Sequence, residues 1–284
     1  MDPHLVKPGA AGPAPADPAP RTPRCGAPAD RPSDSPSDSP LQTPSALALA
    51  PSEPCLPRCN QLIERLPPAD RQRLLAVCDW VPLPLSDVLC APDQASEHAY
   101  FPASGVISMA LLADAHPGLE VGMVGCEGML GLPLALGVQG EPLRATVQGA
   151  GAAWRLPAAA LRREMAGGSA LRSLLSRYVF VRMAELATGA ACQRFHLIGP
   201  RLARRLLMSQ DRAGAQRFHV TQEFLANMLG VRRVGVTTAA AALQRSGVIA
   251  YHRGDLTVLD RPGLEAAACS CYARDRQSYA RLMG

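Results

Sequence analysis

The chain has 284 residues, enough for two domains of ordinary size and a further segment, and 48% of its residues are hydrophobic. No apolar run approaches the ~18 residues that suggest a membrane span, and the first residues lack the features of a secretory signal. Nine cysteines, an odd number without framework spacing, favour a reducing compartment, so we expect a cytoplasmic protein.

The net charge of +5 is divided unequally along the chain. From Gln193 onward there are fourteen arginines against six acidic residues, a net charge of +8, whereas the preceding part carries −3. This asymmetry indicates a polyanionic partner for the C-terminal part. The sequence lacks a glycine-rich phosphate loop, G-x-S-x-G and H-E-x-x-H, so we do not expect an enzyme.

Residues 1–57 contain fifteen of the 27 prolines, in stretches such as "RPSDSPSDSPLQTP", and we predict a disordered tail. Helical spacing then predicts two short helices in "NQLIERL" and "PADRQRLLAVC". Between Trp80 and Leu156, short apolar segments separated by Gly, Pro and Asp predict a compact antiparallel sandwich or barrel. A return to helical spacing follows in "LPAAALRREM".

A long helix is predicted from Ser169 to Ala191, and its apolar surface is wider than one core requires. The width fits either a partner helix, such as that of a second subunit, or coverage by its own domain. The next helix, "GPRLARRLLMSQDR", should turn its leucines inward. Its outward residues are expected to be Arg201, Arg204 and Arg205.

A helix-turn-helix pattern follows in "VTQEFLANMLGVRRVGVTTAAAALQRSGVI". Thr221 is a good N-cap for the first helix, and Ala226 is small enough to let a second helix approach. Gly230 stands four residues later, where a tight turn needs a positive φ, and a β-branched residue follows it. An αα-hairpin in an ordinary core is the competing interpretation, and the local positive charge makes it the weaker one.

The second helix, about residues 232–246, is the predicted recognition helix, with Val236, Ala239 and Leu243 buried. Its N-terminal turns would direct arginines at guanine edges and phosphates in a major groove. The alternating "VIAYHRGDLTVLD" then predicts a β-hairpin wing with a turn at Gly254-Asp255. The expected DNA contacts are Thr221, Gln222, Arg232, Arg233, Gly235, Thr237, Thr238, Arg245 and Arg253.

From Asn60 to about Tyr272 the chain resembles the Crp/Fnr superfamily of bacterial transcription regulators. The resemblance is carried by the helix-turn-helix and wing, and upstream by "HAYFPASGVISM", "VGCEGMLGLPLALG" and "ACQRFHLIGPRLARRLLM". It implies an α+β fold: a jelly-roll-like, cyclic-nucleotide-binding-like β-roll at 58–168, a dimer helix at 169–192 and a winged helix-turn-helix at 193–284. It also implies a homodimer on a pseudo-palindromic double-stranded DNA site, with RNA polymerase as a further partner and no membrane association.

Within this resemblance, Arg233 matches the family's main base-reading arginine. Val234 stands where the best-known members have glutamate, and Thr238 stands at a second common arginine position. The DNA sequence that those members prefer is therefore not expected here. Gly235 costs about 1 kcal/mol relative to Ala inside a helix, which we attribute to close approach to DNA.

The effector pocket implied by the resemblance involves Glu127, Gly128, Met129 and Arg144. In cyclic-AMP-binding members, a Gly-Glu-Leu cassette holds the ribose, and an arginine followed by Ser or Thr holds the phosphate. Here Gly follows Glu127 and Ala145 follows Arg144, so a bound cyclic phosphate would lose a hydroxyl donor, worth about 1.5–3 kcal/mol. A cyclic nucleotide is therefore a disfavoured effector, and surface roles for Glu127 and Arg144 are the alternative.

Fnr-like members hold an iron–sulfur cluster on four cysteines, which makes an oxygen or redox sensor the second alternative. The candidates here are Cys25, Cys55, Cys59 and Cys126. Their spacing does not match the closely grouped N-terminal cysteines of that branch. Cys269 and Cys271 form a C-x-C without clear partner ligands, and His196 and His219 lie apart from them in sequence, so no metal site is expected.

Overall fold

The computed structural model describes residues 59–112, 118–166 and 169–284, so the predicted tail lies outside the described residues. The two predicted short helices are α1 (Gln61–Glu64) and α2 (Pro68–Leu75). Asn60 caps α1 by accepting from the backbone N–H groups of Leu62 and Ile63. Its amide also donates to the carbonyl oxygens of Pro102 and Gly128, both at 2.8 Å, which fastens α1 to the sheet.

An antiparallel sheet of five strands follows, as the short-period segments predict. Its strands are β1 (Asp79–Leu83), β2 (Val88–Cys90), β3 (His98–Leu111), β4 (Leu119–Val124) and β5 (Arg144–Pro157). They lie in the order β1-β5-β3-β4, with β2 also on β5. Gly105 bulges β3 with a φ of +82°, and a Cβ there would lie 2.5 Å from the Gly149 carbonyl oxygen, so only glycine fits.

The sheet is joined to three helices, α3 (Leu132–Ala135), α4 (Ala158–Met165) and α5 (Ala170–Phe195). The hydroxyl of Ser169 caps α5 by accepting from the Arg172 N–H at 3.2 Å. Helix α5 continues four residues beyond the predicted end, because the single Gly189 does not interrupt its hydrogen bonding. Its inner face packs against α1, α2, α4 and the ends of β3 and β5 in one hydrophobic core.

The C-terminal part combines four helices with a small sheet. Its elements are α6 (Ile198–Ala213), β6 (Arg217–His219), α7 (Gln222–Leu229), α8 (Arg233–Arg245), β7 (Ile249–His252), β8 (Asp255–Val258) and α9 (Arg261–Ala267). The strands lie in the order β6-β8-β7 and cover a core that α6, α7 and α8 share. The α+β architecture is therefore confirmed.

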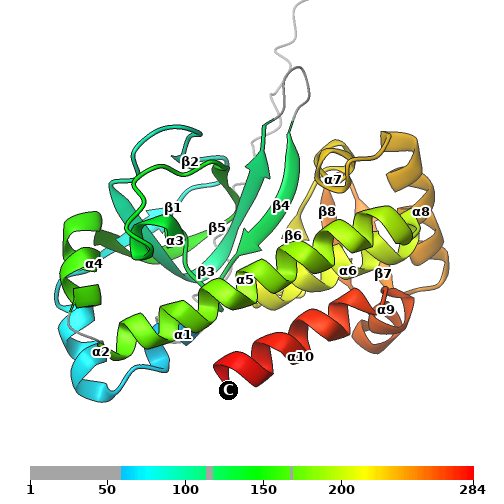
Figure 1. The fold of residues 1–284 in the computed structure, drawn as a ribbon. Coiled ribbons are helices and arrows are strands. Elements are labelled where there is room, and N and C mark those ends of the chain that lie inside the picture. The colour runs from blue at the N-terminus through cyan, green and yellow to red at the C-terminus, as the bar shows by residue number, and fades with distance from the viewer. Residues whose placement is uncertain (1–58, 113–117, 167–168) are drawn as a thin grey trace, which may run out of the picture. The chain divides into compact units, whose positions relative to one another are not determined.

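The last helix, α10 (Cys271–Met283), leaves this C-terminal part and runs beside α5 (Figure 1). Met283 is only 2% exposed and belongs to the core that α5 shares with the sheet. The Tyr279 hydroxyl donates at 2.7 Å to the carbonyl oxygen of Glu127, which follows β4 in the sequence. Among the described residues, no helix combines the length and the hydrophobicity needed to cross a bilayer.

Candidate nucleic-acid interface

The corner between α7 and α8 has the geometry that its sequence predicts. The Thr221 hydroxyl accepts from the Phe224 N–H at 3.1 Å and caps α7. Gly230 ends that helix in the left-handed region, with a φ of +61°, and the Val231 N–H donates to the Ala226 carbonyl oxygen at 3.0 Å. A tight left-handed end of this kind turns the chain directly into α8.

The N-terminus of α8 is built differently from that of α7. No side chain caps it, and its first turn holds no acidic residue, whereas α7 has both Thr221 and Glu223. Arg232 and Arg233 stand at this end, and both are exposed. Because unpaired N–H groups and the helix dipole favour negative charge here, the end is suited to an anion.

The exposed face of α8 continues from this end. Thr237 and Thr238 are both exposed, and the Thr237 hydroxyl donates to the Gln222 side-chain oxygen at 2.7 Å. The structure thus brings together two predicted contact residues from different helices. Arg245 is exposed as well but lies in the last turn of α8, away from the arginine pair.

Gly235 packs closely against another helix of the protein, a contact that the sequence prediction missed. A Cβ at this position would lie 2.8 Å from the Cδ1 atom of Ile198, at the start of α6. The position therefore faces α6, and the close packing of α8 on α6 is a second reason for a small residue here. The attribution of Gly235 to close approach of DNA stays a prediction.

The wing forms from β7 and β8, with a turn one residue earlier than predicted. His252 pairs with Asp255, so Arg253 and Gly254 make a two-residue loop with φ angles of +50° and +90°. Positive φ at both positions is the geometry of a type I′ hairpin. Arg253 is exposed at the tip, where it was predicted.

A third strand, β6, adds to the wing and was not predicted, because three residues carry too little periodicity. Arg217 and His219 on this strand lie beside Asp255, at 2.9 Å and 3.3 Å. Hydrogen bonds from Arg217 and His219 lower the pKa of Asp255. The carboxylate beside the wing tip is therefore held ionised by Arg217 and His219 of the same sheet.

The arginines of α6 point inward, which corrects the prediction that they face outward. Arg201 and Arg205 are buried and Arg204 is half-buried, because α6 packs on β3 and α10 as well as on α8 and α9. Arg201 donates to the Leu229 carbonyl oxygen, and the Arg204 guanidinium lies 2.6 Å from an Asp275 carboxylate oxygen. These cations hold the fold together and are not available to a nucleic acid.

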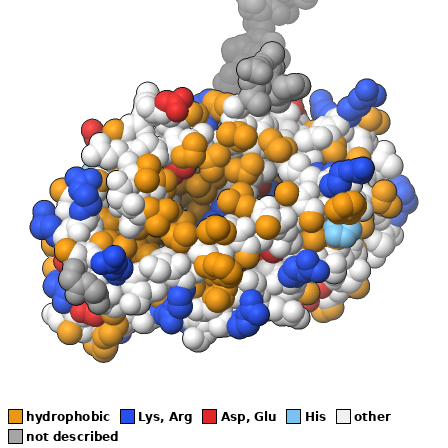
Figure 2. All heavy atoms as spheres, in the orientation of Figure 1, with side chains coloured by type: hydrophobic (Ala, Val, Ile, Leu, Met, Phe, Trp, Pro, Cys, Tyr) orange, Lys and Arg blue, Asp and Glu red, His pale blue; other side chains and the backbone are white. Residues whose placement is uncertain are grey.

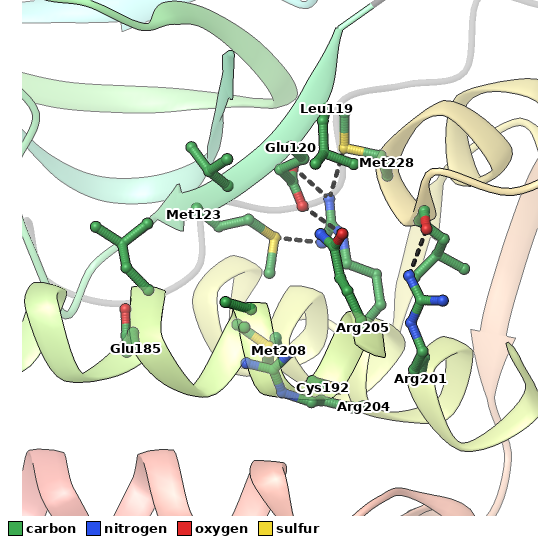
Figure 3. Close-up of a pocket in the computed structure, with 17 residues that line it drawn as sticks. Leu119, Glu120, Met123, Glu185, Cys192, Arg201, Arg204, Arg205, Met208 and Met228 are labelled. Atoms are coloured by element: carbon green, nitrogen blue, oxygen red, sulfur yellow. Dashed lines mark hydrogen bonds and ion pairs between the residues drawn. The ribbon is translucent and has the colours of Figure 1, made fainter. Parts of the chain in front are cut away.

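Arg205 of α6 connects the C-terminal part to the β-roll (Figure 3). Its Nε lies 2.8 Å from a Glu120 carboxylate oxygen on β4, and both side chains are less than 10% exposed. Ser108 donates to the same carboxylate at 2.6 Å, and Arg205 also donates to Gln148. The pair joins β4 to α6 inside the molecule, beside a cavity of about 350 Å³.

The residues predicted for an effector pocket are dispersed. Glu127 is ion-paired with Arg212 of α6 at 2.9 Å, and among the described residues no ion pair joins it to Arg144. A Cβ at Gly128 would overlap the hydroxyl of Tyr178 from α5, so that position packs against the long helix. Arg144 is exposed at the first residue of β5.

Met129, the fourth residue predicted for the effector pocket, is 1% exposed and lines a cavity of about 120 Å³ between the sheet and α5. Arg182 of α5 and Glu141 line the same cavity. Small-molecule sites usually have volumes of about 300–1,000 Å³. The cavity in this conformation is therefore smaller than an ordinary ligand site.

The cysteines proposed for an iron–sulfur cluster are only partly described. Cys25 and Cys55 lie outside the described residues. Cys59 and Cys126 are each partly exposed thiols, and the Gln61 amide approaches the Cys126 sulfur at 3.9 Å.

Comparison with known proteins agrees with this geometry. Residues 200–267 match the family model of the Crp-like helix-turn-helix domain. No curated protein gives a significant match to the sequence of the chain.

Several solved structures share the fold at low sequence identity. FixK2 from Bradyrhizobium japonicum is 14% identical with a TM-score of 0.59, and the match covers 68% of this chain and 98% of that one. A CRP/FNR-family regulator from Thermus thermophilus is 22% identical, with a TM-score of 0.55 and coverage of 67% and 98%. The c-di-GMP-responsive global regulator CLP from Xanthomonas campestris is 15% identical, with a TM-score of 0.55 and the same coverage. Residues 200–267 are therefore identified as a Crp-like helix-turn-helix domain, and the described chain shares its overall fold with these solved regulators.

Proposed function

We propose that the chain is a homodimeric, sequence-specific DNA-binding regulator of transcription that acts in the cytoplasm and is not an enzyme. The observation that carries the proposal is the N-terminus of α8, where two exposed arginines flank a helix end without a cap or an acid. A duplex offers both of the groups that such an end binds, phosphates and guanine edges.

Within this proposal the exposed residues have different roles. Arg233, in the first turn of α8, reads a base edge in the major groove, and Arg232 contacts the flanking phosphate. Arg253 contacts phosphate from the wing, and Arg245 does so from the far end of α8. Thr221 and Gln222 at the start of α7, with Thr237 and Thr238 on α8, complete the surface that faces the duplex.

Selection of sites from random DNA at defined salt, followed by titration of variants, tests these roles. Arg233→Ala should cost about 1–3 kcal/mol of binding and relax specificity at one base pair. Arg253→Ala should weaken binding to all DNA sequences by a similar factor and reduce the slope of log binding constant against log salt concentration by about one. Arg162→Ala, an exposed arginine on α4, is the matched control and should bind like the parent chain. Unchanged binding of both test variants to the selected site would contradict the role assignments.

The proposed dimer forms through the outer face of α5. Phe180, Met183 and Leu186 recur there at three-residue spacing and are 54%, 60% and 44% exposed. Hydrophobic side chains gather around a hollow on the side of the molecule that α5 occupies in Figure 1, as Figure 2 shows. A second copy of the same helix would cover this stripe, and paired recognition helices would then meet half-sites about one helical turn apart.

Sedimentation velocity tests the dimer directly. Met183→Glu should shift the chain from dimer to monomer and abolish binding to a two-half-site duplex, because a charge would stand in the apolar seam. Leu85→Glu, at a position that is 52% exposed between β1 and β2, is the control and should remain dimeric. A dimer that persists in Met183→Glu would place the interface elsewhere.

We further propose that the β-roll controls DNA binding through α5 and the Glu120–Arg205 contact, and that the DNA-bound dimer engages RNA polymerase. Both connections run from the sheet to the C-terminal part. Cyclic nucleotides should leave DNA affinity unchanged, since Glu127 is already paired with Arg212. A change in affinity on adding cyclic AMP would instead support Glu127, Gly128, Met129 and Arg144 as an effector site.

A further inference from the structure

Three cysteines and a histidine that are distant in sequence converge where α5 ends and α10 begins. Cys192 lies in the last turns of α5, and His196 is the C-cap residue of that helix. Cys269 and Cys271 flank Ser270, the N-cap residue of α10. One ligand atom from each of the four residues lies within 4.8 Å of every other.

The spacing of these atoms suits a single small ion. The Cys192 and Cys269 sulfurs are 3.5 Å apart, and the Cys271 sulfur is 3.5 Å from Nδ1 of His196. Zinc bonds of about 2.3 Å to sulfur and about 2.0–2.1 Å to nitrogen place neighbouring ligand atoms of a tetrahedron roughly 3.5–3.8 Å apart. We propose that Cys192, His196, Cys269 and Cys271 bind one zinc ion in a tetrahedral site.

The local structure explains how these residues meet. Cys192 and His196 are four residues apart, so they project from the same side of α5 near its end. Cys269 and Cys271 are brought to them by the turn before α10, where the Cys269 N–H donates to the Pro200 carbonyl oxygen at 3.3 Å. The sequence separation of these pairs hid the site and led to the expectation that no metal is bound.

The surroundings fit three thiolates. All three cysteine side chains are buried, with Cys192 only 2% exposed. Three thiolates and a neutral imidazole around Zn²⁺ leave one negative charge, and the Arg204 guanidinium is placed to compensate it. Arg204 and Cys192 line the same cavity, and an Asp275 carboxylate oxygen lies 2.6 Å from the Arg204 guanidinium.

Two other uses of the same residues fit less well. A Cys192–Cys269 disulfide would bring the sulfurs to about 2.05 Å and leave Cys271 and His196 without a role. A four-iron cluster binds each thiolate to a different iron atom, so its ligands stand farther apart than those around one ion. The compact group of four donors therefore favours one zinc ion.

The site would fasten the end of α5 to the start of α10, next to the chain entering α6. It lies apart from the exposed face of α8, so the inference does not depend on DNA binding. Metal binding should accordingly stabilise the folded chain.

Cobalt replacement in the full-length chain, purified under reducing and anaerobic conditions, tests the site. The chain stripped with a chelator should bind one equivalent of Co²⁺ and develop thiolate-to-cobalt charge transfer with the strong visible bands of tetrahedral cobalt. One equivalent of Zn²⁺ should displace it and raise the melting temperature. Absence of the tetrahedral spectrum in the parent chain would refute the site without the use of any variant.

Variants locate the ion. Cys271→Ser should lower zinc affinity by more than about 100-fold, beyond the 10–100-fold loss typical of an outer-shell partner. His196→Gln should also bind more weakly and shift the cobalt spectrum. Cys126→Ser, a partly exposed thiol in the connection after β4, is the control and should keep the full equivalent. Full cobalt binding by Cys271→Ser, or a Cys192–Cys269 disulfide found by peptide mass mapping of the anaerobic protein, would overturn the proposal.

Discussion

The buried Glu120–Arg205 pair joins β4 to α6, and each of its two charges is expected to depend on the other. Burial raises the pKa of Glu120 although Arg205 is adjacent, and burial lowers the pKa of Arg205 although Glu120 is adjacent. Both shifts mean that removing the two charges from water costs more free energy than their mutual attraction contributes. A pair of this kind contributes little net stability but is costly to break on one side.

The informative change is Glu120→Gln, which removes the charge and keeps the shape. Arg205 is then left charged, at 6% side-chain exposure, with Gln148, Ser209 and the new amide as its polar partners. Breaking one side of a buried pair costs about 3–5 kcal/mol, and we expect about 3 because the amide still accepts a hydrogen bond. At about 2–4 °C per kcal/mol for a body of this size, the melting temperature should fall by about 6–12 °C.

Urea unfolding followed by two probes measures this loss. Both tryptophans, Trp80 and Trp154, lie in the sheet, so their fluorescence reports on the β-roll, whereas far-ultraviolet circular dichroism reports mainly on the helices. The two transitions should coincide in the parent chain and separate in Glu120→Gln, because the contact between the parts is weakened.

Two further variants calibrate the result. Replacing the pair by Glu120→Leu with Arg205→Met should be close to neutral, or stabilising by up to about 4 kcal/mol. Arg73→Ala removes an arginine that is 53% exposed and should cost less than about 1 kcal/mol. If Glu120→Gln costs no more than Arg73→Ala, the reasoning about the buried charge is refuted.

Three other outcomes follow from contacts described above. Gly230→Ala should destabilise the chain by about 1–2 kcal/mol in urea unfolding, because φ is +61° there and the new Cβ would lie 3.0 Å from Leu119. An unchanged urea midpoint would exclude the left-handed turn. Leu225→Ala, at 1% exposure, should cost about 2–5 kcal/mol and reduce helical circular dichroism at 37 °C, whereas a surface-like effect below about 1 kcal/mol would contradict its place in the core. Burial raises the pKa of Tyr279 to about 12, so its contribution to stability is complete below the unfolded pKa of about 10 and is lost as pH rises through 12. In Tyr279→Phe, the urea midpoint should therefore fall less steeply between pH 10 and 12 than in the parent chain. An equally steep fall in that variant would assign the effect to another group.

Local patterns in the sequence predict the elements and the corner of the helix-turn-helix well. Thr221 and Gly230 act through contacts within a few residues, so their identities are sufficient to place the cap and the left-handed turn. The exposed positions of Arg232 and Arg233 follow from the periodicity of Val236 and its neighbours, since a helix that buries one stripe exposes the opposite side.

What the sequence did not predict depends on partners far along the chain. Helical spacing puts Arg205 on a polar face, but it does not say that Glu120 on β4 faces it across 85 residues. The close contact at position 235 comes from Ile198, and the proposed zinc ligands come together only because α5 and α10 meet. Each of these follows from tertiary packing, which no local period encodes.

The return of α10 to α5 has a mechanical consequence. Phe195 and Leu197, at the junction of α5 and α6, are 75% and 80% exposed and offer a protease an accessible peptide bond. Cleavage there would not free the C-terminal part, because Met283 still packs in the core between α5 and the sheet and Arg205 still pairs with Glu120 of β4. The nicked fragments should travel together through a sizing column and come apart only in denaturant.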